Sequence, residues 1–218
     1  MSLIENLKTV RESLPENVTL IAVSKTKPAA DVKTLFDAGQ LDFGENRVQE
    51  LVEKYEQLPK EIRWHLIGHL QKNKVKYIAE FVHLIHSVDS EDLLKEIDKQ
   101  GKKHKRIIDC LLQLRIAKED TKFGMEKREA QKILHHCKTE YPNVRIIGLM
   151  GMATFTDDEK QVRKEFVFLK DCFDYFHFYY PYLKILSMGM SGDYKIAVEE
   201  GSNMVRIGSS IFGEREYN

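Results

Sequence analysis

Lys25 is the residue of this 218-residue chain whose position best suits covalent chemistry with a carbonyl compound. It follows the apolar run 20–23 by two positions, so the pleat of a β-strand there would direct its side chain toward the mouth of a barrel rather than toward the surrounding helices. A lysine that is partly desolvated has a lowered pKa and can form a Schiff base with an aldehyde. The alternative is a solvated lysine in a loop, a description that fits Lys27 better.

Two segments rich in glycine and serine, 187–193 and 206–210, could bind an anion. Glycine allows backbone N–H groups to approach an anion closely, and a phosphate between two neighbouring strand ends is a recurrent feature of α/β barrels. The glycines are Gly189, Gly192 and Gly208, and the hydroxyl donors are Ser187, Ser191, Ser209 and Ser210. The alternative is that these glycines only form tight turns.

Arg206 lies two positions before Gly208 in an otherwise apolar segment. An arginine directed into a barrel is unfavourable unless a partner compensates its charge. Two alternatives follow: Arg206 pairs with an acidic residue, for which Glu45 is a candidate, or it forms hydrogen bonds with a bound ligand.

Signals for metal or thiol chemistry are weak. His65 and His69 have the i, i+4 spacing of helical metal ligands, but Gly68 and a predicted strand remove the shared helical face. His135 and His136 belong to a polar segment that favours a solvated helix. The three cysteines, Cys110, Cys137 and Cys172, form no C-x-x-C pair and are expected to be small buried residues. We therefore expect no metal site.

The elements that would position these residues alternate between short apolar runs and polar segments of helical period. Eight apolar runs are predicted as strands: 19–23, 41–43, 64–67, 81–85, 107–114, 144–150, 185–188 and 204–207. Helical signals include Ser90 and Asp157 or Asp158 as N-caps. This alternation predicts a parallel sheet, and no linker divides residues 1–218. We expect one trimmed (β/α)₈ TIM barrel, with an open doubly wound sheet as the alternative.

An extra N-terminal helix is expected to complete the outer ring of this barrel. Segment 3–14 is apolar at helical spacing, whereas too few residues follow the eighth predicted strand for another helix. The polar N-terminus has no signal-peptide core, and no apolar stretch is long enough to span a membrane, so we expect a cytoplasmic protein. The formal net charge of zero argues against a nucleic-acid binder, since such proteins need a basic surface.

Seven motifs, in order along nearly the whole chain, resemble those of the pyridoxal phosphate homeostasis protein family, whose fold is the alanine racemase N-terminal type of barrel. The motifs are residues 22–28, 43–46, 64–68, 70–74, 148–150, 187–193 and 205–213. The resemblance implies pyridoxal 5'-phosphate as the cofactor and Lys25 as its Schiff-base lysine. It implies further roles for other positions: Ser191, Gly208 and Ser209, together with Ser187, at the phosphate, Arg206 opposite the pyridine nitrogen, Asn46 near the cofactor, and His65 and Met150 as pocket lining.

The function that the resemblance implies is storage of the cofactor rather than robust catalysis. A protonated Arg206 would leave the pyridine nitrogen unprotonated, which weakens the cofactor as an electron sink. Racemases of this barrel type also use a second domain, for which 218 residues leave no room. We expect a carrier, monomeric or weakly dimeric, that balances vitamin B6 and amino acids and could supply apoenzymes. The alternatives are a small amino-acid racemase and a phosphosugar-binding barrel whose lysine forms a carbinolamine.

Overall fold

The computed structural model describes residues 2–117 and 123–213 and contains a closed barrel of eight parallel strands. The strands are β1 Thr19–Val23, β2 Asp42–Glu45, β3 Arg63–Leu66, β4 Leu84–Val88, β5 Ile108–Gln113, β6 Val144–Met150, β7 Ile185–Met190 and β8 Met204–Ile207. Each strand pairs with the next, and β8 pairs with β1 to close the barrel. The predicted (β/α)₈ barrel is therefore confirmed, and the open sheet is excluded.

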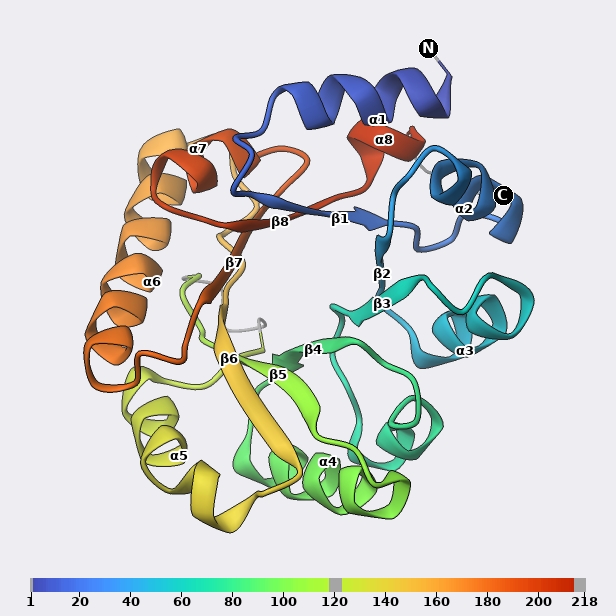
Figure 1. The fold of residues 1–218 in the computed structure, drawn as a ribbon. Coiled ribbons are helices and arrows are strands. Elements are labelled where there is room, and N and C mark those ends of the chain that lie inside the picture. Colours follow the sequence, from blue (N-terminus) through green and yellow to red (C-terminus); the bar gives the residue numbers. More distant parts are fainter. Residues whose placement is uncertain (1, 118–122, 214–218) are drawn as a thin grey trace.

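The helices surround the strands on the outside of the barrel (Figure 1). They are α1 Leu3–Glu12, α2 Ala29–Asp37, α3 Val48–Gln57, the 3₁₀ helix η1 Lys72–Tyr77, α4 Glu91–His104, α5 Lys127–Glu140, α6 Glu159–Tyr179, α7 Tyr194–Glu199 and α8 Ser209–Phe212. The predicted N-terminal helix is present as α1. The expectation of no helix after the eighth strand is wrong, because α8 forms one short turn there. Helices α1 and α8 are in contact, and the Asn6 side chain of α1 donates to the Ile211 carbonyl of α8 at 3.0 Å.

Most element boundaries follow the apolar runs, and β1, β6 and β8 have the predicted limits. The fourth strand begins at Leu84 rather than at residue 81, because the Phe81 and Val82 N–H groups donate to the Ile78 carbonyl and belong to the preceding turn. Ser90 caps α4 by accepting the Leu93 N–H, as predicted. Asp158, one of the two candidates, caps α6.

Two apolar layers stabilise the barrel. The larger lies between the strands and the helices, and the smaller fills the interior with Ile21, Leu84, Leu111, Met150 and Met204. Because side chains alternate along a strand, the interior position of Ile21 also directs Val23 and Lys25 inward. Along β8, the interior position of Met204 likewise places Arg206 and Gly208 on the inward face.

The three cysteines are free and buried, as expected. Burial raises the pKa of the Cys137 thiol to about 11. The thiol therefore stays protonated at neutral pH, and Cys137 serves as a packing residue. Among the described residues, no helix is long and apolar enough to cross a membrane.

Candidate functional site

A cavity of about 700 Å³ opens at the end of the barrel where the strands reach their carboxyl ends, which we call the carboxyl mouth. Six predicted site residues line it together: Lys25, Asn46, Ser191, Arg206, Gly208 and Ser209. They come from the segments after β1, β2, β7 and β8 and from β8 itself. The size of the cavity lies in the usual range for small-molecule sites, roughly 300–1,000 Å³. The structure thus brings together residues far apart in the sequence.

Hydrogen bonds on both sides of Lys25 fix its backbone. The preceding residue, Ser24, is fully buried; its N–H donates to the Gly44 carbonyl and its carbonyl accepts from Lys54 Nζ at 2.7 Å. The following residue, Thr26, has a left-handed backbone with φ of 64°, and its N–H donates to Glu50 at 2.8 Å. Lys25 itself is half-buried. The β1–α2 loop is therefore held in place from both flanks of the lysine.

A buried ion pair supports the same loop. Lys54 Nζ lies 2.5 Å from Glu45 Oε1, and the Ser24 hydroxyl donates to the same carboxylate oxygen at 2.7 Å. Burial raises the pKa of Glu45, and the Lys54 ammonium opposes that shift. The Glu45–Arg206 pairing considered from the sequence is wrong, because the partners of Glu45 are Lys54 and Ser24. Side chains of α3 and β2 thus converge on the residue before Lys25.

The β7 and β8 ends offer donors for an anion. The Gly208 N–H donates to Ser191 Oγ at 3.1 Å, which brings the two segments together. Gly189 has φ of +97°, and a Cβ there would lie 2.6 Å from the Ala197 Cβ, so only glycine fits this turn. Asp193 stabilises the turn by accepting the Met190 N–H at 2.6 Å. Ser191, Gly208 and Ser209 therefore line the cavity close to one another.

If this cavity binds pyridoxal phosphate, as the sequence resemblance implies, Ser191→Ala should weaken that binding by about tenfold to 150-fold, since a hydrogen bond to a charged group contributes roughly 1.5–3 kcal/mol. Fluorescence or absorbance titration of the purified variant measures this. Ser210→Ala is the matched control, because Ser210 is exposed and does not line the cavity. Equal affinities for the two variants would contradict the assignment of Ser191.

Arg206 lies at the base of the cavity and is only 3% exposed. One guanidinium nitrogen donates to Ser187 Oγ at 2.6 Å and another to the Gly151 carbonyl at 3.1 Å. Burial lowers the pKa of this guanidinium to about 10, and the charge of Asp193 opposes that effect. Arg206 therefore remains a cation at neutral pH.

Three other predicted residues lie deeper and do not line this cavity. Met150 packs in the interior apolar layer. Ser187 is fully buried and contacts Arg206 from below. His65 is 1% exposed and borders a second cavity, at the opposite end of the barrel, which we call the amino mouth. The expectation that His65 and Met150 line the pocket is therefore corrected: both point inward, but at a lower level than the residues that follow the strands.

Several lining residues were not singled out from the sequence. Gln113 ends β5 and donates to the Phe123 carbonyl at 2.9 Å. His69, which the sequence offered only as a weak metal ligand, also lines the cavity; it stacks on Phe123 and bonds to Asp89 at 3.1 Å. Thr154 is held by Glu165, which accepts from its backbone and its hydroxyl. A signal existed for Gln113, which with Asp109 is one of two polar residues in the apolar run 107–114 and is the one near its carboxyl end.

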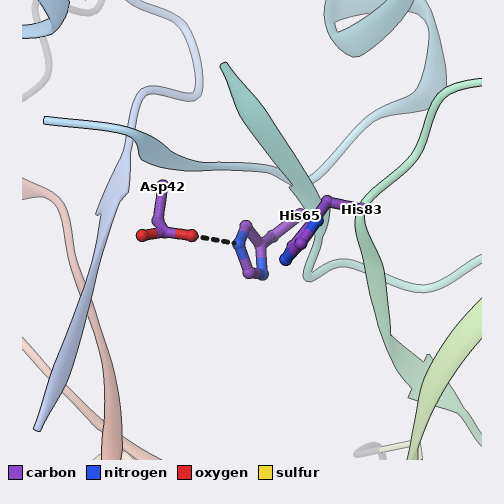
Figure 2. A group of neighbouring side chains, drawn as sticks. All are labelled: Asp42, His65 and His83. Carbon is purple, nitrogen blue, oxygen red and sulfur yellow. Dashed lines mark hydrogen bonds and ion pairs between the residues drawn. The ribbon is translucent and has the colours of Figure 1, made fainter. Parts of the chain in front are cut away.

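The amino mouth contains a group of possible metal ligands, Asp42, His65 and His83 (Figure 2). His65 Nε2 bonds to Asp42 Oδ1 at 3.0 Å, and the Arg63 guanidinium pairs with Asp42 Oδ2 at 2.5 Å. The Arg63 charge opposes a cation beside the carboxylate. This arrangement favours a hydrogen-bonded cluster over a metal centre.

Comparisons with known proteins agree with this geometry. The family model described as alanine racemase, N-terminal domain, matches residues 1–216. A pyridoxal phosphate homeostasis protein of Aquifex aeolicus is 40% identical over 200 residues, covering 91% of this chain and 87% of that protein. One from Escherichia coli K12 is 36% identical over 211 residues, covering 94% of this chain and 88% of that protein.

Solved structures show the same fold. PipY of Synechococcus elongatus PCC7942, solved with PLP bound, superposes with a TM-score of 0.89 at 35% identity, covering 97% of this chain and 100% of PipY. An alanine racemase of Clostridium difficile 630 superposes with a TM-score of 0.79 at 17% identity, covering 100% of this chain but 58% of the racemase. The racemase match shows the barrel fold alone.

Proposed function

The chain belongs to the alanine racemase N-terminal domain family, and we propose that it binds pyridoxal 5'-phosphate at the carboxyl mouth and acts in the homeostasis of this cofactor. The observation that carries the proposal is the convergence of Lys25, Arg206 and the Ser191–Gly208 pair on one cavity. The relatives named pyridoxal phosphate homeostasis protein, and PipY solved with PLP bound, support the same assignment.

The residues present fit this cofactor. The cavity of about 700 Å³ is lined by an amine, by hydroxyl and backbone N–H groups, and by a guanidinium. These groups suit the aldehyde, the phosphate and the ring nitrogen of the cofactor, in that order. When bound, pyridoxal phosphate supplies an aldehyde that condenses with a primary amine to a Schiff base, with loss of water. We assign Lys25 as that amine, the segments after β7 and β8 as the phosphate site, and Arg206 as the partner of the pyridine nitrogen. Asn46 lies beside this site.

A storage role follows from the chemistry of Arg206. The guanidinium is a donor only, so a pyridine nitrogen that it faces accepts a hydrogen bond and stays unprotonated. That state disfavours carbanion chemistry on the ring. Free buried cysteines are typical of a reducing compartment. In this proposal the protein acts in the cytoplasm, as a monomer or weak homodimer, and supplies the cofactor to apoenzymes that depend on it.

The test is an absorbance spectrum of the purified protein with pyridoxal phosphate, before and after borohydride reduction, followed by peptide mapping. We expect an absorbance band of a protein-bound Schiff base and a stable label on Lys25 after reduction. A colourless protein that acquires no label would overturn the proposal. Stereospecific exchange of an amino acid α-proton in deuterated water would instead indicate a racemase.

A further inference from the structure

Five buried polar side chains form a continuous series of hydrogen bonds through the barrel interior. Arg206 bonds to Ser187 Oγ at 2.6 Å, and Ser187 Oγ lies 3.1 Å from His86 Nδ1. His86 Nε2 lies 3.0 Å from His65 Nδ1, and His65 Nε2 lies 3.0 Å from Asp42 Oδ1. Each of the five is at most 7% exposed. The series starts at the carboxyl-mouth cavity and ends at the amino-mouth cavity.

The direction of every bond follows from the two ends. A guanidinium only donates and a carboxylate only accepts. Because Asp42 accepts, His65 must carry its proton on Nε2, so in neutral His65 the Nδ1 atom accepts from His86 Nε2. Neutral His86 then accepts at Nδ1 from the Ser187 hydroxyl, which leaves the Ser187 oxygen to accept from Arg206.

The charge states agree with that direction. Burial lowers the pKa of His65 and places that of His86 well below its ordinary value, so both rings are neutral at neutral pH. Burial tends to raise the pKa of Asp42, but His65 and Arg63 outweigh it and hold the carboxyl ionised. Each group in the series therefore directs its hydrogen toward Asp42 and its lone pair toward Arg206, an alignment that stabilises both buried charges.

We infer that Asp42 is a positioning residue for the cofactor site, acting on Arg206 through His65, His86 and Ser187. The inference rests on the proposed function for its effect on binding, but the bonding pattern itself does not. Asp193 acts on Arg206 through its charge and accepts the Met190 N–H, whereas Asp42 is joined to Arg206 by the series of hydrogen bonds. Asp42 and His65 at the amino mouth are thus the far end of the series that begins at Arg206.

The first test uses the wild-type protein without ligand. Long-range ¹⁵N–¹H NMR of the histidine rings at neutral pH is expected to show His65 and His86 neutral, each with its proton on Nε2. A proton on Nδ1 of either ring, or a charged ring, would overturn the inference. This result does not depend on pyridoxal phosphate, so it separates failure of the series from failure of the proposed function.

The second test measures binding of pyridoxal phosphate to Asp42→Asn and Arg63→Gln. Asparagine can still accept the His65 N–H but has no charge, so Asp42→Asn is expected to weaken binding by about fivefold, the equivalent of roughly 1 kcal/mol. Arg63→Gln removes the exposed partner of Asp42 and leaves the series intact, so its affinity should stay within about twofold of wild type. Wild-type affinity in Asp42→Asn, with native circular dichroism, would refute the remote role.

Discussion

Replacing Lys25 by alanine is expected to abolish covalent attachment of pyridoxal phosphate completely. The methyl group of alanine cannot form a Schiff base, and Ser191, Gly208, Ser209 and Arg206 remain to hold the cofactor by hydrogen bonds and charge alone. We expect no borohydride-fixed label by mass spectrometry and a dissociation constant raised by on the order of tenfold or more. Because Lys25 is half-buried and follows the strand, the fold should be retained.

Lys27→Ala is the matched control for this result. Lys27 belongs to the same loop and lines the same cavity, so its removal changes the local charge by the same amount. Lys27→Ala should therefore carry the full covalent label on Lys25. The assignment of Lys25 would be contradicted if Lys25→Ala were labelled to the wild-type level, or if the label in the wild-type protein were found on Lys27.

The barrel and the mouth residues could be predicted because both depend on local sequence periodicity. A strand buried on both faces requires an apolar run, and a residue two positions beyond an inward-facing one also faces inward. This alternation alone places Lys25, two positions after Val23, and Gly208, two positions after Arg206, on the inward face. The placement does not depend on which strands are neighbours.

The height of a side chain inside the barrel could not be predicted in the same way. Strands of a closed barrel are tilted and staggered, so equal positions on two strands lie at different levels along the axis. The resemblance implied that His65 lines the pocket, but Ile67 rather than His65 lines the cavity at the carboxyl mouth, and His65 borders the amino mouth. Met150 similarly lies in the interior layer, while Met152 lines the cavity.

Contacts between elements that are distant in the sequence could not be predicted from local patterns either. Lys54 belongs to a helical segment with many charged residues, where a lysine is expected to be solvated. In the structure its side chain is 8% exposed and reaches the Ser24 carbonyl and Glu45. The series from Arg206 to Asp42 likewise joins five residues from five strands or strand ends. Only the closed barrel brings them together.

The ion pair between Lys54 and Glu45 leads to the second large expected effect. Lys54→Met should lower the free energy of unfolding by about 3–5 kcal/mol, because it leaves a fully buried carboxylate without its cation. Urea denaturation followed by circular dichroism measures this. The Ser24 carbonyl also loses its ammonium donor, so the loop that carries Lys25 should loosen and the rate of Schiff-base formation should fall.

Two further variants distinguish the buried charge from loss of the lysine side chain itself. Lys33→Met breaks an i, i+4 pair with Asp37 whose side chains are 48% and 57% exposed, so its effect should stay below about 1 kcal/mol. The double variant Glu45→Gln with Lys54→Met removes both charges and should recover most of the lost stability, since an unpaired buried charge is the main penalty. A double variant no more stable than Lys54→Met would instead assign the loss to packing of the lysine chain against α3 and β2. Recovery of stability without recovery of Schiff-base formation would separate the two roles of Lys54, since the Ser24 carbonyl still lacks its donor in the double variant.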